Sequence, residues 1–166
     1  MDIFMKLLLI CSLLILSKTL LSQTAQDSAF EKSKASWPFP ISNFTSFVSE
    51  ESNNNESNDI GHKGIIFFSD KADSVKAVFE GKVEIAFPVG NGFAVIVNYG
   101  DYFITYINLD SPAVKPGDLI RQGQWMGNLL SGNKQIKLVI TTRNNNEYDP
   151  YDWFKWTKEE ESKRKY

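Results

Sequence analysis

The feature that most constrains this chain is a series of short apolar segments that begins at residue 64 and ends at residue 141. Each segment is rich in β-branched and aromatic residues, and turns containing glycine separate them. The segments lie at 64–68, 74–78, 82–87, 93–98, 102–107, 118–121, 124–129 and 135–141. Gly90–Gly92 and Gly100–Asp101 fit tight hairpin turns, because their residues tolerate positive φ. No helical stripe precedes residue 151, so the sequence predicts an all-β, antiparallel domain.

The last of these segments alternates between an apolar face and a more polar one. Successive side chains of a strand point to opposite sides of the sheet. One set is entirely apolar and comprises Ile136, Leu138 and Ile140. The opposite set contains Gln135 and Lys137. The residues that surround this more polar face decide whether the domain can be an enzyme.

Composition narrows the classes of protein that the chain can represent. Of its 166 residues, 42% are hydrophobic and 23% are charged, so the chain can bury a core and is not globally disordered. The net charge of -2 and the lack of a basic run interleaved with aromatic residues argue against nucleic acid as a partner. The single cysteine, Cys11, cannot form an internal disulfide, and the sequence holds no Cys-x-x-Cys zinc pattern.

The N-terminus has the layout of a secretory signal peptide. Lys6 precedes an apolar stretch from Leu7 to Leu16, and a more polar end follows, with cleavage expected near Ser22. The apolar run is short for a membrane span, which needs about 20 residues. The sequence therefore predicts a chain that is secreted to the periplasm or cell envelope and has no transmembrane segment once mature. The alternative is an uncleaved anchor.

The rest of the chain divides by composition. We predict a signal peptide at 1–22, a flexible linker at 23–60, a β domain at 61–156 and a charged tail at 157–166. The linker is rich in Ser, Asn, Gln and Glu, which bury little apolar surface. Its exception is the stretch SWPFPISNF, in which Trp37, Phe39 and Phe44 could dock on the β domain. The tail is expected to be a solvated helix or coil.

Four stretches, taken in order, resemble the lysostaphin-type (LytM-like) zinc endopeptidases of bacterial cell walls. They are HKGIIFFSDKADSVKAVFEGKV at 62–83, GNGFAVIVNYGDYFITYINLD at 90–110, VKPGDLIRQGQWMGNLLSG at 114–132, and QIKLVI at 135–140 with YDPYDWF behind it. The resemblance covers residues 62–154. It implies the family's fold, an antiparallel barrel-sandwich hybrid.

The same resemblance implies where a zinc site would lie. The family's enzymes hold one zinc with a histidine, an aspartate four residues later and the second histidine of an HxH pair, and two further histidines assist catalysis. Carried onto this chain, the first ligand is present as His62, but the aspartate position is Ile66 and the second HxH position is Lys137. The assisting positions are Asn108 and Gln135. The resemblance therefore implies a vestigial binding groove rather than a catalytic site.

The chemistry of these residues is unfavourable for zinc. Zinc sites need at least three donors from Cys, His or carboxylates, and His62 is the single imidazole of the chain. Ile66 has no lone pair, and the ammonium of Lys137 repels a dication. Even two unit charges about 4 Å apart interact by roughly 4 kcal/mol at an effective dielectric constant near 20. The nearby carboxylates Asp70, Asp73, Asp101 and Asp110 sit in expected turns. The sequence thus predicts no metal, no catalytic residue and no metal-activated water.

Three functions follow from these observations. The first is a non-catalytic, peptidase-like domain of the bacterial cell envelope that binds peptidoglycan or regulates a cell-wall hydrolase, with a groove suited to an extended peptide. The alternative is an active zinc metalloendopeptidase that uses Lys137 or a loop carboxylate as an atypical ligand. A third arises because VKPGDLIRQGQWMG also resembles biotinyl/lipoyl-like domains, but the hairpin tips GNG and GD carry no lysine for a cofactor.

Overall fold

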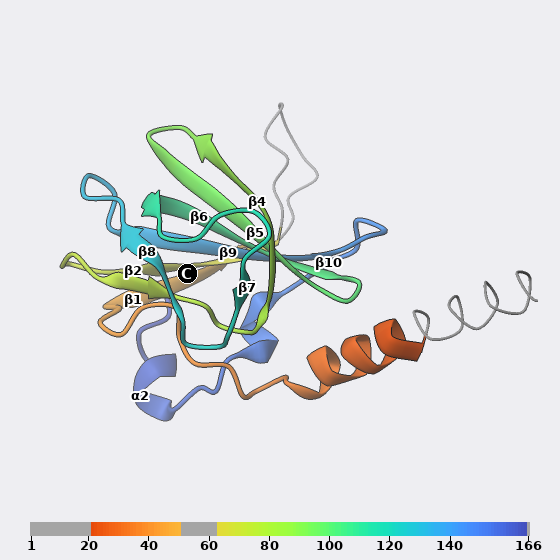
Figure 1. The fold of residues 1–166 in the computed structure, drawn as a ribbon. Coiled ribbons are helices and arrows are strands. Elements are labelled where there is room, and N and C mark those ends of the chain that lie inside the picture. The colour runs from red at the N-terminus through yellow and green to blue at the C-terminus, as the bar shows by residue number, and fades with distance from the viewer. Residues whose placement is uncertain (1–20, 51–62, 166) are drawn as a thin grey trace, which may run out of the picture.

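The computed structural model describes residues 21–50 and 63–165. Its strands form one antiparallel sheet that is not closed into a barrel, with the order β1-β2-β9-β6-β5-β4-β7, while β10 pairs with β9, and β8 pairs with β3 and β6 (Figure 1). The elements are β1 Ser46–Glu50, β2 Gly64–Phe68, β3 Ser74–Lys76, β4 Gly81–Val89, β5 Gly92–Tyr99, β6 Tyr102–Pro112, β7 Leu119–Ile120, β8 Trp125–Leu129, β9 Gln135–Thr142, β10 Glu147–Tyr148, the 3-10 helix η1 Pro150–Trp153 and α2 Lys158–Glu161. The prediction of an all-β, antiparallel fold is confirmed.

Every predicted strand is present, although several boundaries move. The segment predicted at 102–107 extends to Pro112, and the one predicted at 118–121 contracts to the two residues of β7. The turns at Gly90 and Gly100 have positive φ, as the hairpins require. Two strands, β1 and β10, were not predicted from the sequence.

The core lies on one face of the sheet, as the alternation in β9 predicts. Ile136, Leu138 and Ile140 are fully buried, and so are Ile65 and Phe67 of the neighbouring strand β2. Burying a large apolar side chain of this kind stabilises the fold by about 1.5–3 kcal/mol. The opposite face of the same strands does not carry the core and is therefore available for a functional site.

The prediction of a flexible linker over 23–60 is wrong for residues 23–50. Residues 21–32 are helical and contribute the buried side chain of Phe30 to the core, and the segment that follows contributes those of Trp37, Phe44 and Phe47. The segment is polar on average, so its few large aromatic residues do not stand out in the composition. Each of them buries enough apolar surface to hold the backbone against the domain. The expected docking of Trp37, Phe39 and Phe44 is observed. Residues 51–60 lie outside the described residues.

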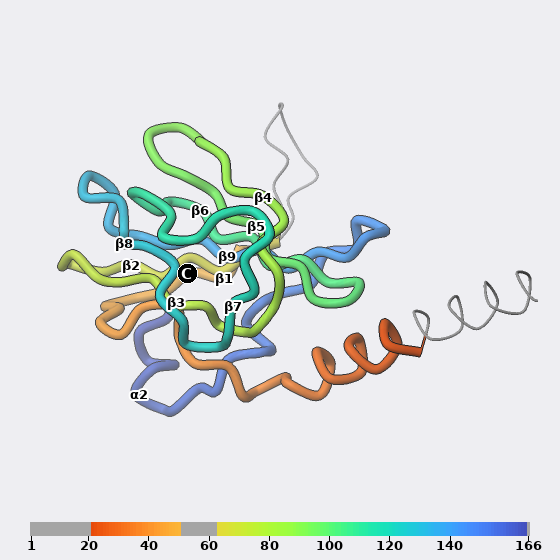
Figure 2. The backbone as a smooth tube through the Cα atoms, viewed as in Figure 1, coloured from red at the N-terminus to blue at the C-terminus, as the bar shows by residue number. Residues whose placement is uncertain are grey.

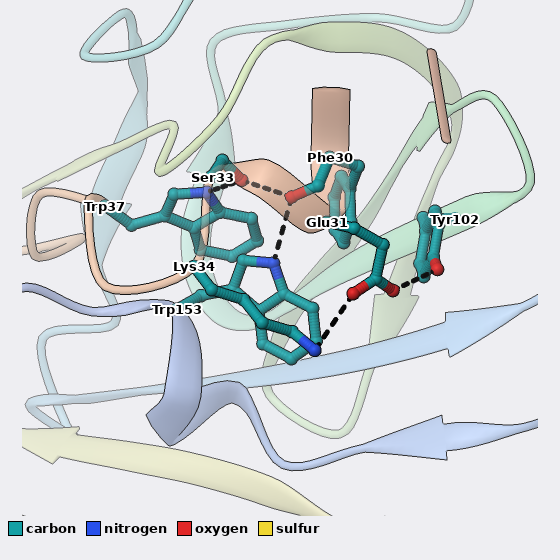
Figure 3. Close-up of polar contacts among 7 residues, drawn as sticks. All are labelled: Phe30, Glu31, Ser33, Lys34, Trp37, Tyr102 and Trp153. Atoms are coloured by element: carbon teal, nitrogen blue, oxygen red, sulfur yellow. Dashed lines mark hydrogen bonds and ion pairs between the residues drawn. The ribbon is translucent and has the colours of Figure 1, made fainter. Parts of the chain in front are cut away.

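Polar contacts hold the N-terminal segment in place around its aromatic side chains (Figure 3). The ring of Phe30 stacks on Tyr102 with 4.1 Å between centroids, and the hydroxyl of Tyr102 donates to the carboxylate of Glu31. Lys34 pairs with Glu31 at 2.9 Å and lies over the ring of Trp153. Burial raises the pKa of Glu31, but its hydrogen bonds from Tyr102 and Lys34 outweigh burial and leave the pKa below its ordinary value.

The C-terminal segment packs against the N-terminal segment, and Figure 2 shows the two running side by side. Trp37 forms a parallel bridge with Phe154, and Phe47 forms another with Arg164. Within the predicted tail, α2 buries no residue and begins with a capping box between Thr157 and Glu160. The helix is solvated as expected, and the backbone after it forms a single bridge to Phe47 of the edge strand β1.

The predicted signal peptide stays a prediction, because residues 1–20 lie outside the described residues. In the described part of the chain, no helix has both the length and the apolar character needed to cross a bilayer. The helix over 21–32 projects from the side of the domain (Figure 1).

Candidate functional site

The face of the sheet opposite the core carries the residues that the resemblance singles out. Strand register places Val48, Ile66, Lys137 and Ile107 in one row across β1, β2, β9 and β6. Directly opposite residues of neighbouring strands point to the same side, so these side chains share this face, which we call the open face. All four are half-buried. The open face is thus mainly aliphatic around one lysine.

Ile66 and Lys137 lie directly opposite each other in the pairing of β2 with β9. These are the positions at which the family's enzymes carry the aspartate and the second HxH histidine. The structure therefore brings the two sequence-predicted ligand positions together, as a metal site would require. The side chains themselves do not fit zinc, because one is aliphatic and the other is a cation.

Lys137 forms an ion pair with Glu50, the last residue of β1. The distance between Lys137 Nζ and Glu50 Oε2 is 2.5 Å, and the two side chains are 23% and 37% exposed. To reach Glu50, the lysine crosses β2 above Gly64, which is the partner of Glu50 in the sheet. A Cβ at Gly64 would lie 2.9 Å from Lys137 Cε. The missing side chain of Gly64 therefore leaves the space that the ion pair needs.

Asn108 occupies a β-bulge next to this row. In the pairing of β6 with β5, Ile107 faces Ala94 and Leu109 faces Phe93, so Asn108 has no partner between them. Its φ is 82°, a left-handed conformation that asparagine adopts more readily than most residues. Its carbonyl accepts a hydrogen bond from the Leu130 N–H at 3.2 Å. The backbone thus explains an asparagine here without any catalytic role.

Gln135 begins β9 and lies opposite Phe68, on the same face as Lys137 two residues later. It is half-buried. His62, the remaining predicted site residue, lies outside the described residues. The structure therefore brings Ile66, Gln135 and Lys137 onto one face. Asn108 lies in the bulge directly after Ile107, which is the neighbour of Lys137 on β6.

Carboxylates do not replace the missing donors in the described part of the chain. No group of three or more His, Cys, Asp or Glu side chains gathers there in a way that could hold a metal ion. Asp73 instead accepts hydrogen bonds from the backbone N–H groups of Ser42 and Asn43, and Asp101 pairs with Arg143 at 3.3 Å. The zinc implied by the resemblance therefore does not fit the described donors.

A pocket of about 350 Å³ opens on the same face, farther along β9 toward Thr141. It is lined by Glu84, Ile85, Ile96, Phe103, Thr105, Thr141 and Arg143. Thr105 lies opposite Val139, which follows Lys137 by two residues on β9. We call this hollow the side pocket. Sequence reasoning missed it, although the alternation of β5 and β6 places Ile96 and Thr105 on the less buried side of each strand.

A second hollow, of about 560 Å³, lies between the helix over 21–32 and the ends of β4 and β5. Its lining includes Gln23, Gln26, Tyr99 and Leu119. It does not share the face that carries Ile66 and Lys137, whereas the side pocket does. The candidate functional site is therefore the open face with its side pocket.

The fold, together with Ile66 and Lys137 at the former ligand positions, defines a peptidase-like domain. The family model described as peptidase family M23 matches residues 60–150, which is more than half of the chain. The chain therefore belongs to peptidase family M23, and it is a degenerate member that lacks most of the family's metal ligands. No curated protein sequence matches the chain.

Solved structures show the same fold at low sequence identity. Csd3 from Helicobacter pylori, in its hexagonal crystal, is 17% identical with a TM-score of 0.60, and the match covers 73% of this chain and 33% of that one. A chain of the SpoIIQ–SpoIIIAH pore-forming complex is 20% identical with a TM-score of 0.57, covering 71% and 90%. The catalytic domain of the prophage-encoded M23 protein EnpA from Enterococcus faecalis is 19% identical with a TM-score of 0.53, covering 69% and 92%. The chain spans about a third of the length of Csd3.

Proposed function

We propose that this chain is a non-catalytic member of family M23 that is exported to the bacterial cell envelope and binds a peptide of the cell wall on its open face. One observation carries the proposal: Lys137 stands at a ligand position and is engaged by Glu50 at 2.5 Å. An ammonium that is held by a carboxylate has no electron pair for a metal, and it repels a dication. Ile66 beside it supplies no donor either.

The open face supports peptide binding in place of catalysis. Its half-buried aliphatic residues Val48, Ile66 and Ile107 provide apolar contact, and the side pocket adds the hydroxyl groups of Thr105 and Thr141. Binding sites for small ligands and peptides combine such apolar surface with a few polar groups. An extended peptide of the peptidoglycan stem matches this combination.

The first test is metal content and hydrolysis. We expect the purified chain, after removal of its first 23 residues, to hold no stoichiometric zinc by elemental analysis and to leave purified peptidoglycan uncleaved. Cleavage that a chelator abolishes would contradict the proposal and support the alternative, an active zinc metalloendopeptidase with atypical ligands.

Restoring the family's residues tests the assignment of the ligand positions. The combined variant Ile66→Asp, Asn108→His, Gln135→His and Lys137→His should bind about one zinc ion per chain. The changes at 66 and 137 complete three ligands with His62, and the changes at 108 and 135 restore the assisting histidines. The matched control keeps Lys137 and changes the other three positions, and we expect it to bind no zinc. A folded four-position variant without zinc would show that the assigned register is wrong.

A second candidate function is binding of a protein partner, such as a cell-wall hydrolase that the chain would regulate, and one comparison favours a protein partner. A structural neighbour of this chain comes from a complex between SpoIIQ and SpoIIIAH. Co-sedimentation with protein-free peptidoglycan separates the two candidates. Binding supports a peptidoglycan ligand, whereas a chain that stays in the supernatant favours a protein partner.

A further inference from the structure

We infer that Lys137 is the receptor for a free carboxylate of the bound peptide, and that Glu50 occupies this receptor while the domain is empty. The inference rests on the proposed peptide binding by the open face and adds the chemical class of the ligand. It also gives Glu50 a role as an internal competitor.

The surroundings of Lys137 favour an anion at this position. The lysine side chain is 23% exposed and has Ile66 and Ile107 as its neighbours on β2 and β6. An ammonium removed this far from water needs a negatively charged partner, and in this aliphatic setting the attraction is stronger than on an open surface. Glu50 supplies that partner in the free domain.

Glu50 is placed so that another carboxylate can replace it. It ends β1, an edge strand of the described sheet, and its side chain is 37% exposed. Lys137, in contrast, lies in β9, which is paired on both sides by β2 and β6. The acceptor is therefore accessible from solvent, whereas the cation is fixed in the middle of the sheet.

The side pocket fixes where the rest of the ligand would lie. Thr105 is one row away from Lys137, because its partner Val139 follows Lys137 by two residues. Two residues of an extended strand span about 6.6–6.8 Å. A peptide whose terminal carboxylate binds Lys137 can therefore place its last residues in the 350 Å³ side pocket, against Ile96 and Phe103.

A purely structural role for the ion pair makes the opposite prediction. If Glu50 and Lys137 only tie β1 to β9, loss of the carboxylate weakens the fold and cannot improve binding. If Glu50 competes with a ligand, its loss makes the receptor more available and tightens binding. The sign of the effect of Glu50→Gln therefore separates the two roles.

The experiment uses one peptide in two forms, N-acetyl-Lys-D-Ala-D-Ala as the free acid and as the C-terminal amide, titrated calorimetrically into the purified full chain. We expect the acid to bind about tenfold or more tightly than the amide, as for a hydrogen bond to a charged group. Glu50→Gln should tighten binding of the acid several-fold and leave the amide unchanged. Lys137→Gln should remove the difference between the two forms.

Matched controls use charged residues on other surfaces. Lys76→Gln on β3 and Glu159→Gln on α2 change exposed side chains, and we expect neither to alter the affinity for the acid or the amide. Thermal melts of all variants report whether each one is folded. The comparison of acid and amide on the unmodified chain needs no variant at all.

Three outcomes would overturn the inference. Equal affinities for acid and amide, or weaker binding of the acid by folded Glu50→Gln, would exclude a carboxylate receptor and leave the proposed peptide binding intact. Binding of neither form by the unmodified chain would also exclude it. In that case, co-sedimentation of the same sample with purified peptidoglycan decides whether the proposed function survives.

Discussion

Single residues show how the domain accommodates a lysine at a former metal-ligand position. Lys137 replaces a metal ligand, Glu50 neutralises it, and Gly64 leaves the space between them. Ile66 contributes an aliphatic neighbour on the same row. A lysine at this depth without the carboxylate would leave a charge poorly solvated and unpaired, which is costly.

The role of Gly64 gives a prediction at this scale. Gly64→Ala places a methyl group 2.9 Å from Lys137 Cε and 3.0 Å from the Leu138 carbonyl oxygen. We expect the free energy of unfolding, measured by urea denaturation, to fall by about 1–3 kcal/mol, as in other overpacked sites. Gly132→Ala is the matched control, because nothing lies within 4 Å of its added Cβ. Equal stability of the two variants would contradict this account of Gly64.

The positions of the site residues could be predicted from the sequence, but their partners could not. Motif spacing assigned Ile66 and Lys137 to ligand positions, and the pairing of β2 with β9 places the two residues opposite each other. Glu50 lies far from Lys137 in the sequence and belongs to a strand that the polar composition concealed. The positive φ of Asn108 depends on a bulge that only the register of β5 and β6 reveals.

Among the elements, the strands were predictable and the N-terminal segment was not. Strands with one buried face show a regular alternation, whereas the helix over 21–32 buries little beyond Phe30 and has no apolar stripe to detect. Its position depends on contacts with Tyr102 and Trp153, which are distant in the sequence. A composition-based reading therefore takes such a segment for a linker.

The N-terminal helix supplies the second prediction. Phe30→Ala should lower the free energy of unfolding by about 3–5 kcal/mol, because it removes a ring that is fully buried among other aromatic rings. Leu21→Ala on the same helix is the control, since Leu21 is 70% exposed and its loss should change stability little. Chemical denaturation monitored by tryptophan fluorescence measures both. A neutral Phe30→Ala would restore the interpretation of this segment as a linker.

The molecule as a whole should lose stability at high pH. Burial raises the pKa of both Tyr102 and Tyr106, and the hydrogen bond to Glu31 raises that of Tyr102 further. Unfolded tyrosine ionises near pH 10. Because the folded state holds both hydroxyls neutral, their contribution is complete below pH 10 and is lost progressively as the pH rises above it.

Melting temperatures between pH 8 and pH 11 test this behaviour. We expect a steady fall above pH 10 for the unmodified chain, and a shallower fall for Tyr102→Phe, which cannot ionise at that position. Parallel curves for the two proteins would mean that Tyr102 does not contribute to the alkaline transition.

The bridges from Trp37 to Phe154 and from Phe47 to Arg164 have a consequence for the order in which the molecule is made. A ribosome releases Trp37 and Phe47 more than a hundred positions before these bridge partners, so the bridges form only when translation is almost complete. Contacts this distant in sequence slow folding. The domain should therefore reach its complete fold only at the end of synthesis, when the C-terminal segment closes over the N-terminal one.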